Sequence, residues 1–406
     1  MMGMKVAIAT PEFLPNWGGI GTYVTLLAKE LPEDFEVHVI TLKRGEPPVS
    51  TEQTKDLLDR IHIHYLGNAA DFFAYNNQFQ INLLLKFKAL KTQHKFDLIH
   101  ANHAQMPDLF LRFLDSETPS LTTIHTTIGS QRLGTKRSRL PFHNLERSEK
   151  MTYLMLPMLT TLERLYLSKA RSEIFVSEYI RTFYSKSYHL APQWRVIHNG
   201  VDTEWFKPRE RGECLEHFPK LDGLDDIILF SGRMIALKGI DMAIKALALI
   251  QRETDATMVF AGAGKIEPWK EMLDGLNVPP DRYRFLGSVP YTEMPYLYSL
   301  SSTFMLPSYS ESFPMTVLEA MACGLPVVAS NVGGIPEMID SNQNGILIQP
   351  GNERGLSAAL LKLIGDRNFA KRLGSNARKK ACEEFSSLKM ATDTAEMYRI
   401  TVEGSK

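Results

Sequence analysis

The sequence predicts two α/β domains in series, each built on a doubly wound parallel sheet, facing each other across a cleft. Short strand-like runs alternate with helical runs almost from end to end. Several strand candidates are apolar at nearly every position, as parallel strands buried on both faces are. The alternation starts again after Asn199-Gly200-Val201-Asp202, so the same Rossmann-like architecture is expected twice.

Each expected element follows from its local pattern. Helical runs such as 21–31 and 79–92 separate the strands of the first half, and 240–252, 269–276 and 316–322 separate those of the second. The strands expected in the first half are 5–10, 36–42, 61–67, 97–101, 120–125 and 173–177. Those expected in the second half are 226–231, 256–261, 283–286, 303–307, 326–330 and 345–348.

The restart of the pattern sets the domain boundaries. We assign 1–195 to an amino-terminal domain and 196–386 to a carboxyl-terminal domain. The last helical run, 387–406, is kept apart, and spacing alone leaves open whether it crosses back to the first domain. The apolar run 151–167 contains Pro157 and charged residues, so it predicts a packed amphipathic helix and not a span of about 20 apolar residues.

Composition excludes several function classes. The 406 residues carry 46 basic and 46 acidic side chains, so the basic excess typical of nucleic-acid binding is missing, and we expect no nucleic-acid partner. Three scattered cysteines are typical of a reducing compartment. No signal peptide precedes the first strand, so we expect a cytoplasmic protein. The oligomeric state stays open.

Gly18 and Gly19 open the first helix. Free N–H groups at a helix start favour a phosphate or a sugar. A dinucleotide fingerprint would place a third glycine where Val24 stands, and its glycines would follow the strand at once, so NAD binding is excluded. A plain tight turn is the alternative, and the motif alone does not decide between them.

Arg233 and Lys238 lie between the strand 226–231 and the next helix. A guanidinium fork and an ammonium at an already positive helix start can neutralise a diphosphate leaving group. Two solvated surface charges are the alternative. Their place at the carboxyl end of a strand, where open α/β sheets bind ligands, favours a functional role.

Glu311 and Glu319 are the strongest indication of a ligand-binding site in the sequence. Glu311 follows the strand 303–307, and Pro314 suits a first helical turn, which puts Glu319 about one turn inside the helix. A carboxylate at that place can accept both hydroxyls of a ribose. The alternative is a pair of acids favoured by the helix dipole, which explains Glu319 less well because it stands among apolar residues.

His125 ends its strand and can face a cleft, although a structural histidine is the more common outcome. The other ten histidines show no metal-binding spacing. The sequence contains no His-Glu-x-x-His, Cys-x-x-Cys, Asp-x-Asp, phosphate loop or Gly-x-Ser-x-Gly. These absences argue against kinases, metallohydrolases and serine esterases. They favour a diphosphate site that uses Arg and Lys, without a metal or other cofactor.

In order and spacing these motifs resemble the GT-B glycosyltransferases of family 4. Supporting segments are Val196-Ile197-His198-Asn199-Gly200-Val201-Asp202, Phe285-Leu286-Gly287-Ser288-Val289 and Gly324-Leu325-Pro326-Val327-Val328-Ala329-Ser330. The resemblance covers nearly the whole chain. It implies that residues 1–195 bind the acceptor and residues 196–386 bind the donor. It also implies a retaining transfer from a nucleotide diphosphate sugar by a front-face route, in which the leaving phosphate takes the acceptor's proton.

The resemblance also implies a role for each motif residue. Glu319 holds the ribose, Arg233 and Lys238 stabilise the diphosphate, and His125 lies beside the anomeric carbon. Pro314 stands where the family often has glycine, and a proline offers no N–H. The catalytic set is Arg233, Lys238, Glu311 and His125. The donor-binding set is Gly18, Gly19, Arg233, Lys238, Val289 (to the base, through its backbone), Glu311, Phe313, Pro314, Met315, Thr316 and Glu319.

We therefore expect a hexosyltransferase that uses a UDP- or GDP-linked sugar and a sugar, glycan or lipid-linked acceptor. Basic residues at 135–139, with Lys86, Lys88, Lys91 and Lys95, leave a peripheral contact with anionic lipid open. A solvated loop and an ordinary helix face are the alternative. Three alternatives remain. A sugar-nucleotide epimerase would convert the donor alone, and a phosphorylase would need phosphate. A non-catalytic sugar-nucleotide-binding protein has no chemical need for this charged set.

Overall fold

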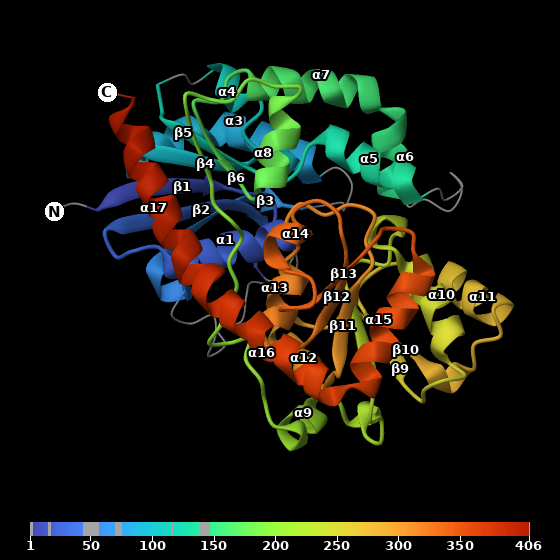
Figure 1. Ribbon diagram of the computed structural model, residues 1–406. Helices are drawn as coiled ribbons and strands as arrows, with labels where there is room; N and C mark the ends of the chain where they lie inside the picture. Colours follow the sequence, from blue (N-terminus) through green and yellow to red (C-terminus); the bar gives the residue numbers. More distant parts are fainter. Residues whose placement is uncertain are drawn as a thin grey trace. The chain divides into compact units, whose positions relative to one another are not determined.

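The computed structural model describes residues 3–14, 18–43, 57–69, 75–114, 117–138 and 147–405 (Figure 1). Unit 1 comprises Met1–Ile128, Pro157–Gly200 and Ser387–Lys406, and unit 2 comprises Gly129–Leu156 and Val201–Ser386. This division differs from the sequence assignment at 129–156, which groups with unit 2, and at 196–200, which groups with unit 1. A Cβ atom built at Gly134 would lie 2.3 Å from Cβ of Ser310, so this segment packs tightly on a loop of unit 2.

A parallel sheet of seven strands forms the centre of unit 1, in the order β3-β2-β1-β4-β5-β6-β7. The order reverses between β1 and β4, which makes that position the switch point of a Rossmann-like sheet. The strands are β1 (Met4–Ala9), β2 (Phe35–Lys43), β3 (Ile61–Asn68), β4 (Leu98–Asn102), β5 (Ser120–Ile124), β6 (Ser172–Phe175) and β7 (Gln193–Val196).

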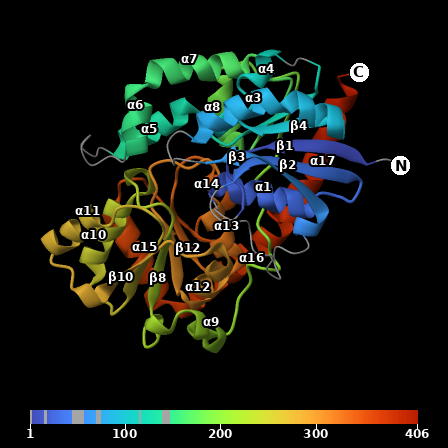
Figure 2. The same cartoon turned by 180° about the vertical axis from the view of Figure 1, so that it is seen from behind.

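Helices cover both faces of this sheet. Phe79, Leu83 and Phe87 of α3 pack on apolar residues of β1 to β4, and α1 and α17 pack together on the opposite face (Figure 2). Tyr398 of α17 joins that face through a 2.7 Å hydrogen bond to Nδ1 of the buried His100. The helices are α1 (Gly19–Glu30), α3 (Tyr75–His94), α4 (Leu111–Leu114), α7 (Leu156–Leu167), α8 (Glu178–Ser185) and α17 (Ser387–Glu403).

Two sequence expectations for this region need correction. The strand β7 was not predicted, because its residues are only partly buried and lack an apolar run. The single helix expected over 151–167 is two helices, α6 (Arg147–Leu154) and α7, with a turn at Met155. Pro157 explains the break, since it has no N–H to bond back to α6 and suits the first turn of a new helix, where it lies in α7.

Unit 2 repeats the architecture with six parallel strands in the order β10-β9-β8-β11-β12-β13. Its switch point lies between β8 and β11, and every residue of both strands is buried. The strands are β8 (Ile227–Ser231), β9 (Thr257–Ala261), β10 (Tyr283–Gly287), β11 (Thr303–Leu306), β12 (Val327–Ser330) and β13 (Ile346–Ile348).

The helices of unit 2 form two groups, one around α10 and α15 and the other around α13 and α16 (Figure 1). None of the helices in the described part of the chain is long and apolar enough to cross a membrane. The helices are α5 (Ile128–Ser138), which begins one residue before the unit, α6, α9 (Arg211–His217), α10 (Ile240–Ile250), α11 (Glu267–Gly275), α12 (Met294–Leu300), α13 (Met315–Ala322), α14 (Ile335–Met338), α15 (Glu353–Gly365) and α16 (Arg367–Glu384).

Candidate functional site

The loops that follow β8 and β11 meet at the switch point of unit 2. The N–H of Tyr309 donates a 2.9 Å hydrogen bond to the carbonyl oxygen of Leu237. Gly239 has a left-handed φ of 72°, and a Cβ atom there would lie 2.0 Å from the carbonyl oxygen of Pro307. Only glycine permits this approach. The sequence therefore fixes the two loops against each other at the edge where such sheets bind ligands.

Lys238 and Glu311 form an ion pair between these two loops. The Nζ atom of Lys238 lies 2.6 Å from Oε1 of Glu311, and the two side chains are 21% and 8% exposed. Ser308 donates a second hydrogen bond to the same oxygen at 2.7 Å. The pairing of Lys238 with Glu311 was not predicted. Ser308 was also missed, although its place three residues before Glu311 in a loop after a strand was a usable signal.

The loop after β12 packs against the backbone of Glu311. Gly333 has φ 61°, and a Cβ atom at this position would lie 1.5 Å from the carbonyl oxygen of Glu311. The same oxygen accepts a 3.4 Å hydrogen bond from the N–H of Gly334. Gly333 is a positioning residue that sequence reasoning missed. The two glycines just after a strand were the available signal.

Replacing Gly333 by alanine is expected to destabilise unit 2 and to lower turnover. The left-handed conformation alone costs a residue with a side chain about 1–2 kcal/mol, and relief of the clash must move the backbone of Glu311. A displacement of about 1 Å in such a site can cost ~10² in rate. Denaturant unfolding and kcat measure the two effects.

Gly275→Ala is the matched control for this substitution. Gly275 ends α11, a Cβ atom added there would have no atom within 4 Å, and its φ is not left-handed. A Gly275→Ala variant should keep both stability and turnover. A Gly333→Ala variant with the stability and turnover of the parent would contradict the positioning role.

Glu319 lies on α13, five residues into the helix, as its spacing from Pro314 predicted. It is 5% exposed, and its Oε2 atom accepts a 2.9 Å hydrogen bond from the hydroxyl of Tyr298 on α12. Burial raises the pKa of Glu319 to about 7, against the smaller lowering effect of the Tyr298 hydroxyl. A ligand that donates hydrogen bonds to such a buried carboxyl would stabilise its charged form. Nothing in the sequence indicated Tyr298.

The residues at the start of α13 leave backbone N–H groups that can bind a ligand. Pro314 is the cap residue directly before α13 and not part of its first turn, which corrects the sequence expectation by one position. The ring of Phe313 is buried against Phe385, with centroids 5.5 Å apart. Met315 and Thr316, both half-buried, begin the helix. Their N–H groups have no partner further back in the helix and can bind an anion.

Arg233 and Val289 each lie two residues past the end of a strand of unit 2. The Arg233 side chain is exposed and has no hydrogen-bond or ion-pair partner in the described part of unit 2. Val289 is half-buried and follows β10 by two residues. Arg233 follows β8 by two residues, which puts its positive charge beside the switch point of unit 2. The structure brings Lys238 and Glu311 into direct contact but shows no contact that joins Arg233 or Val289 to them.

In unit 1, Gly18 caps α1, and its chain neighbour Gly19 is exposed. A Cβ atom at Gly18 would lie 2.5 Å from Oε2 of Glu12, whereas none would touch anything at Gly19. The other carboxylate oxygen of Glu12 accepts a 2.8 Å hydrogen bond from the Tyr75 hydroxyl. Sequence reasoning missed Glu12, which follows β1 and places a carboxylate beside the positive end of α1.

His125 directly follows β5 and is half-buried. Its Nε2 atom lies 2.9 Å from Oδ1 of Asn102, and the edge of its ring meets Tyr23 at 4.7 Å between centroids. Burial, with the nearby His100 and His103, lowers the pKa of His125 to about 3. The imidazole is therefore neutral at physiological pH. Since an amide oxygen only accepts, Nε2 carries the hydrogen and Nδ1 keeps its lone pair.

Two family models match the chain. Glycosyltransferase Family 4 matches residues 17–205, and Glycosyl transferases group 1 matches residues 216–380. An uncharacterized glycosyltransferase of Methanocaldococcus jannaschii is 32% identical over 212 residues, which are 52% of this chain and 54% of that relative. The aligned part thus spans about half the length of that relative.

Other similarities extend over the whole chain. The N-acetyl-alpha-D-glucosaminyl L-malate synthase of Bacillus anthracis is 24% identical over 408 residues, covering 98% of this chain and 97% of that relative. The crystal structure of Anabaena HepE in complex with UDP-glucose shares the fold, with a TM-score of 0.72 and 21% identity over 97% of this chain and 98% of that chain. With the two family models on successive parts and two Rossmann-like sheets, the chain belongs to the GT-B glycosyltransferases of family 4.

Proposed function

We propose that the protein transfers a hexosyl group from a UDP- or GDP-linked sugar to a sugar, glycan or lipid-linked acceptor, with retention of the anomeric configuration. The observation that carries the proposal is the ion pair of Lys238 and Glu311 between the loops that follow β8 and β11 at the switch point of unit 2. Arg233 lies on the same loop as Lys238, and Glu319 lies on the helix that follows Glu311. HepE, which shares the fold, was crystallised with UDP-glucose. The arrangement is chemically suited to such a donor.

Each residue has a task in this proposal. Arg233 and Lys238 stabilise the negative charge of the departing diphosphate, and fixed charges of this kind are commonly the largest contribution to catalysis. Glu311 holds the donor sugar, and its ion pair keeps the ammonium of Lys238 at the site. Glu319 accepts the hydroxyls of the ribose. The N–H groups at the start of α13 hold a phosphate oxygen, and the backbone at Val289 meets the base.

We assign no proton transfer to His125. With a pKa of about 3 its ring is neutral at physiological pH, and Nδ1 is free to accept a hydrogen bond from a donor-sugar hydroxyl. Glu311 is assigned no nucleophilic role either, because its Oε1 already accepts two hydrogen bonds. The leaving phosphate is the base that takes the acceptor's proton on the front face. No metal ion or cofactor is part of this proposal.

The acceptor is proposed as a class only. Lys136 and Arg137 lie in the last turn of α5, and Lys91 in the last turn of α3. Arg139, which the basic segment 135–139 includes, lies outside the described residues. Adjacent basic side chains such as Lys136 and Arg137 can attract anionic headgroups, which supports a lipid-linked acceptor and a peripheral contact with a membrane.

A thermal-shift panel of nucleotide diphosphates and their sugars tests the donor class. The correct donor at about 100 times its Kd should add ~2.7 kcal/mol to the stability of the folded protein. Proton NMR of the reaction with the stabilising donor then reports the anomeric configuration of the product. An inverted product would refute retention. A panel in which no nucleotide sugar stabilises the protein would refute the donor site.

A further inference from the structure

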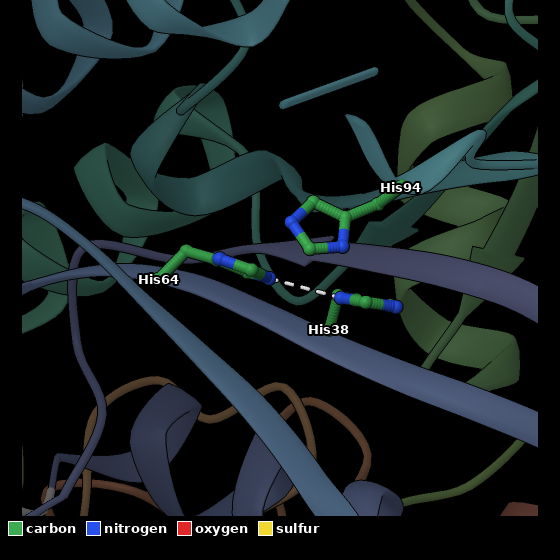
Figure 3. Close-up of side chains that lie close together, drawn as sticks. All are labelled: His38, His64 and His94. Atoms are coloured by element: carbon green, nitrogen blue, oxygen red, sulfur yellow. Dashed lines mark hydrogen bonds between the residues drawn. The ribbon is translucent and has the colours of Figure 1, made fainter. Parts of the chain in front are cut away.

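Three histidines from separate elements of unit 1 lie together, away from the carboxyl ends of its strands. His38 lies in β2, His64 in β3, and His94 is the last residue of α3 (Figure 3). The register of the sheet explains the grouping. His38 lies opposite His62, and Ile40 lies opposite His64, so His64 is the diagonal neighbour of His38 on one face. That face is the one that α3 covers.

The nitrogen atoms of this histidine cluster (His38, His64 and His94) point toward one another. Nδ1 of His38 lies 2.9 Å from Nε2 of His64 (Figure 3). One ring nitrogen from each of the three histidines lies within 4.8 Å of the others. His38 is 1% exposed, whereas His64 and His94 are half-buried. The cluster therefore has a buried inner member and two members that solvent reaches.

A carboxylate sets the tautomer of the inner histidine. Oε1 of Glu36 lies 2.9 Å from Nε2 of His38. Because an ionised carboxylate only accepts, Nε2 of His38 carries the hydrogen, and the lone pair of the neutral ring is on Nδ1, the atom that faces His64. Lys5 holds the same carboxylate in place at 3.0 Å. A carboxylate behind a histidine in this way is the usual outer support of a metal-binding imidazole.

We propose that the histidine cluster binds Zn²⁺ through His38 Nδ1, His64 Nε2 and one ring nitrogen of His94, with a water molecule as the fourth ligand. Imidazole nitrogen selects transition metals over Mg²⁺ and Ca²⁺, which prefer oxygen. Tetrahedral bonds of ~2.0–2.1 Å put neighbouring nitrogens about 3.4 Å apart, so the observed spacing needs only small side-chain shifts.

Zn²⁺ at this position would join β2 and β3 to the end of α3. These elements hold the part of the sheet furthest from β7, and the metal would add a cross-link that the apolar contacts of α3 do not provide. His94 also stacks against Phe96, with centroids 5.8 Å apart and an interplanar angle of 12°, which limits its freedom. The proposed role is structural and is separate from the donor chemistry.

Isothermal titration with ZnCl₂ tests the proposal on the full chain, freed of any affinity tag and treated with a chelator. The parent protein should bind one equivalent. His64→Gln and His94→Gln should each weaken binding at least 100-fold, and Glu36→Gln should weaken it about 10- to 100-fold through the loss of support for His38. Cobalt in place of zinc should give the visible absorption of a tetrahedral site in the parent and not in His94→Gln.

His62→Gln distinguishes the proposed ligand set from a second grouping. His62 is exposed on the same strand as His64, and its ring nitrogen lies within 4.8 Å of the ligand atoms of Glu36 and His38. The His62→Gln variant should bind Zn²⁺ as the parent does. Circular dichroism should show that all variants are folded, and turnover should not change in His94→Gln. Parent protein without stoichiometric binding, or equal losses in His62→Gln and His94→Gln, would overturn the proposal and leave a packed histidine cluster.

Discussion

Arg233→Ala and Lys238→Ala are each expected to lower kcat by about 10²- to 10³-fold. The reason is that each removes one fixed positive charge from the departing diphosphate, and the loss of one such donor typically costs this much. The two variants should differ in stability. Arg233 is exposed and unpaired among the described residues, so its removal should leave the unfolding midpoint unchanged. Removal of Lys238 leaves the buried carboxylate of Glu311 with only Ser308, which costs roughly 1–3 kcal/mol.

Steady-state kinetics with the donor found by thermal shift, together with denaturant unfolding, check both expectations. Arg252→Ala and Lys270→Ala are matched controls, because both residues are exposed and lie outside the loops of the switch point. Both controls should turn over at the parent rate. Near-parent kcat in Arg233→Ala and in Lys238→Ala would refute the assignment of the diphosphate to this site.

Glu319→Gln is expected to make the protein more stable at high pH. The carboxyl of Glu319 releases its proton near pH 4.5 when unfolded and near pH 7 when folded, since burial raises its pKa. Between these values the folded chain binds more protons than the unfolded chain, so its stability falls as pH rises. The cost is below ~1 kcal/mol at pH 5 and about 3 kcal/mol at pH 8. Glutamine has no charge to bury, so its advantage should grow across this window.

Urea unfolding at pH 5, 6.5 and 8 measures the effect. Glu383→Gln, an exposed substitution on α16, is the control and should follow the parent at each pH. A difference between Glu319→Gln and the parent that stays constant from pH 5 to pH 8 would show that Glu319 does not titrate as its burial implies.

The Glu319→Gln substitution should also lower the affinity for the donor about 10²-fold, because hydrogen bonds to a charged group are worth about 1.5–3 kcal/mol. The 2′-deoxy form of the bound nucleotide separates a ribose contact from a general loss of affinity. If Glu319 holds the ribose, Glu319→Gln and the deoxy ligand remove the same interaction, and their effects should not add. Fully additive losses would place the ribose elsewhere.

Apolar pattern was sufficient to predict most of the fold. Buried strands such as β1, β8 and β11 were found because their residues are apolar almost throughout. The edge strands β3 and β10 were found as well, although they are only partly buried. The strand that sequence reasoning missed, β7, lies at the edge of its sheet and contains Trp194, which is 39% exposed, and Arg195. β7 has only four residues, two of them Trp194 and Arg195, so it has no apolar run to mark it as a strand.

The site was predicted as residue types and not as contacts. Spacing placed Glu319 on its helix because a helix has a fixed rise, and the strand ends placed Arg233 and Glu311 at the same edge. Spacing could not show that Lys238 pairs with Glu311 or that Gly333 supports it, since these depend on how loops from three strands approach one another. The histidine cluster was missed for a similar reason, because it depends on the register of β2 and β3.

The return of α17 to unit 1 has a consequence for the order of synthesis. Unit 1 is closed by Ser387–Lys406, but all of Val201–Ser386 is translated first. At about 5–20 residues per second this takes roughly 10–40 s. During that interval the nascent sheet lacks the helix that carries Tyr398, so His100 and Phe35 have no partner from it. Unit 2 has all its segments first. Unit 1, whose translation begins earliest, is therefore the last to be completed.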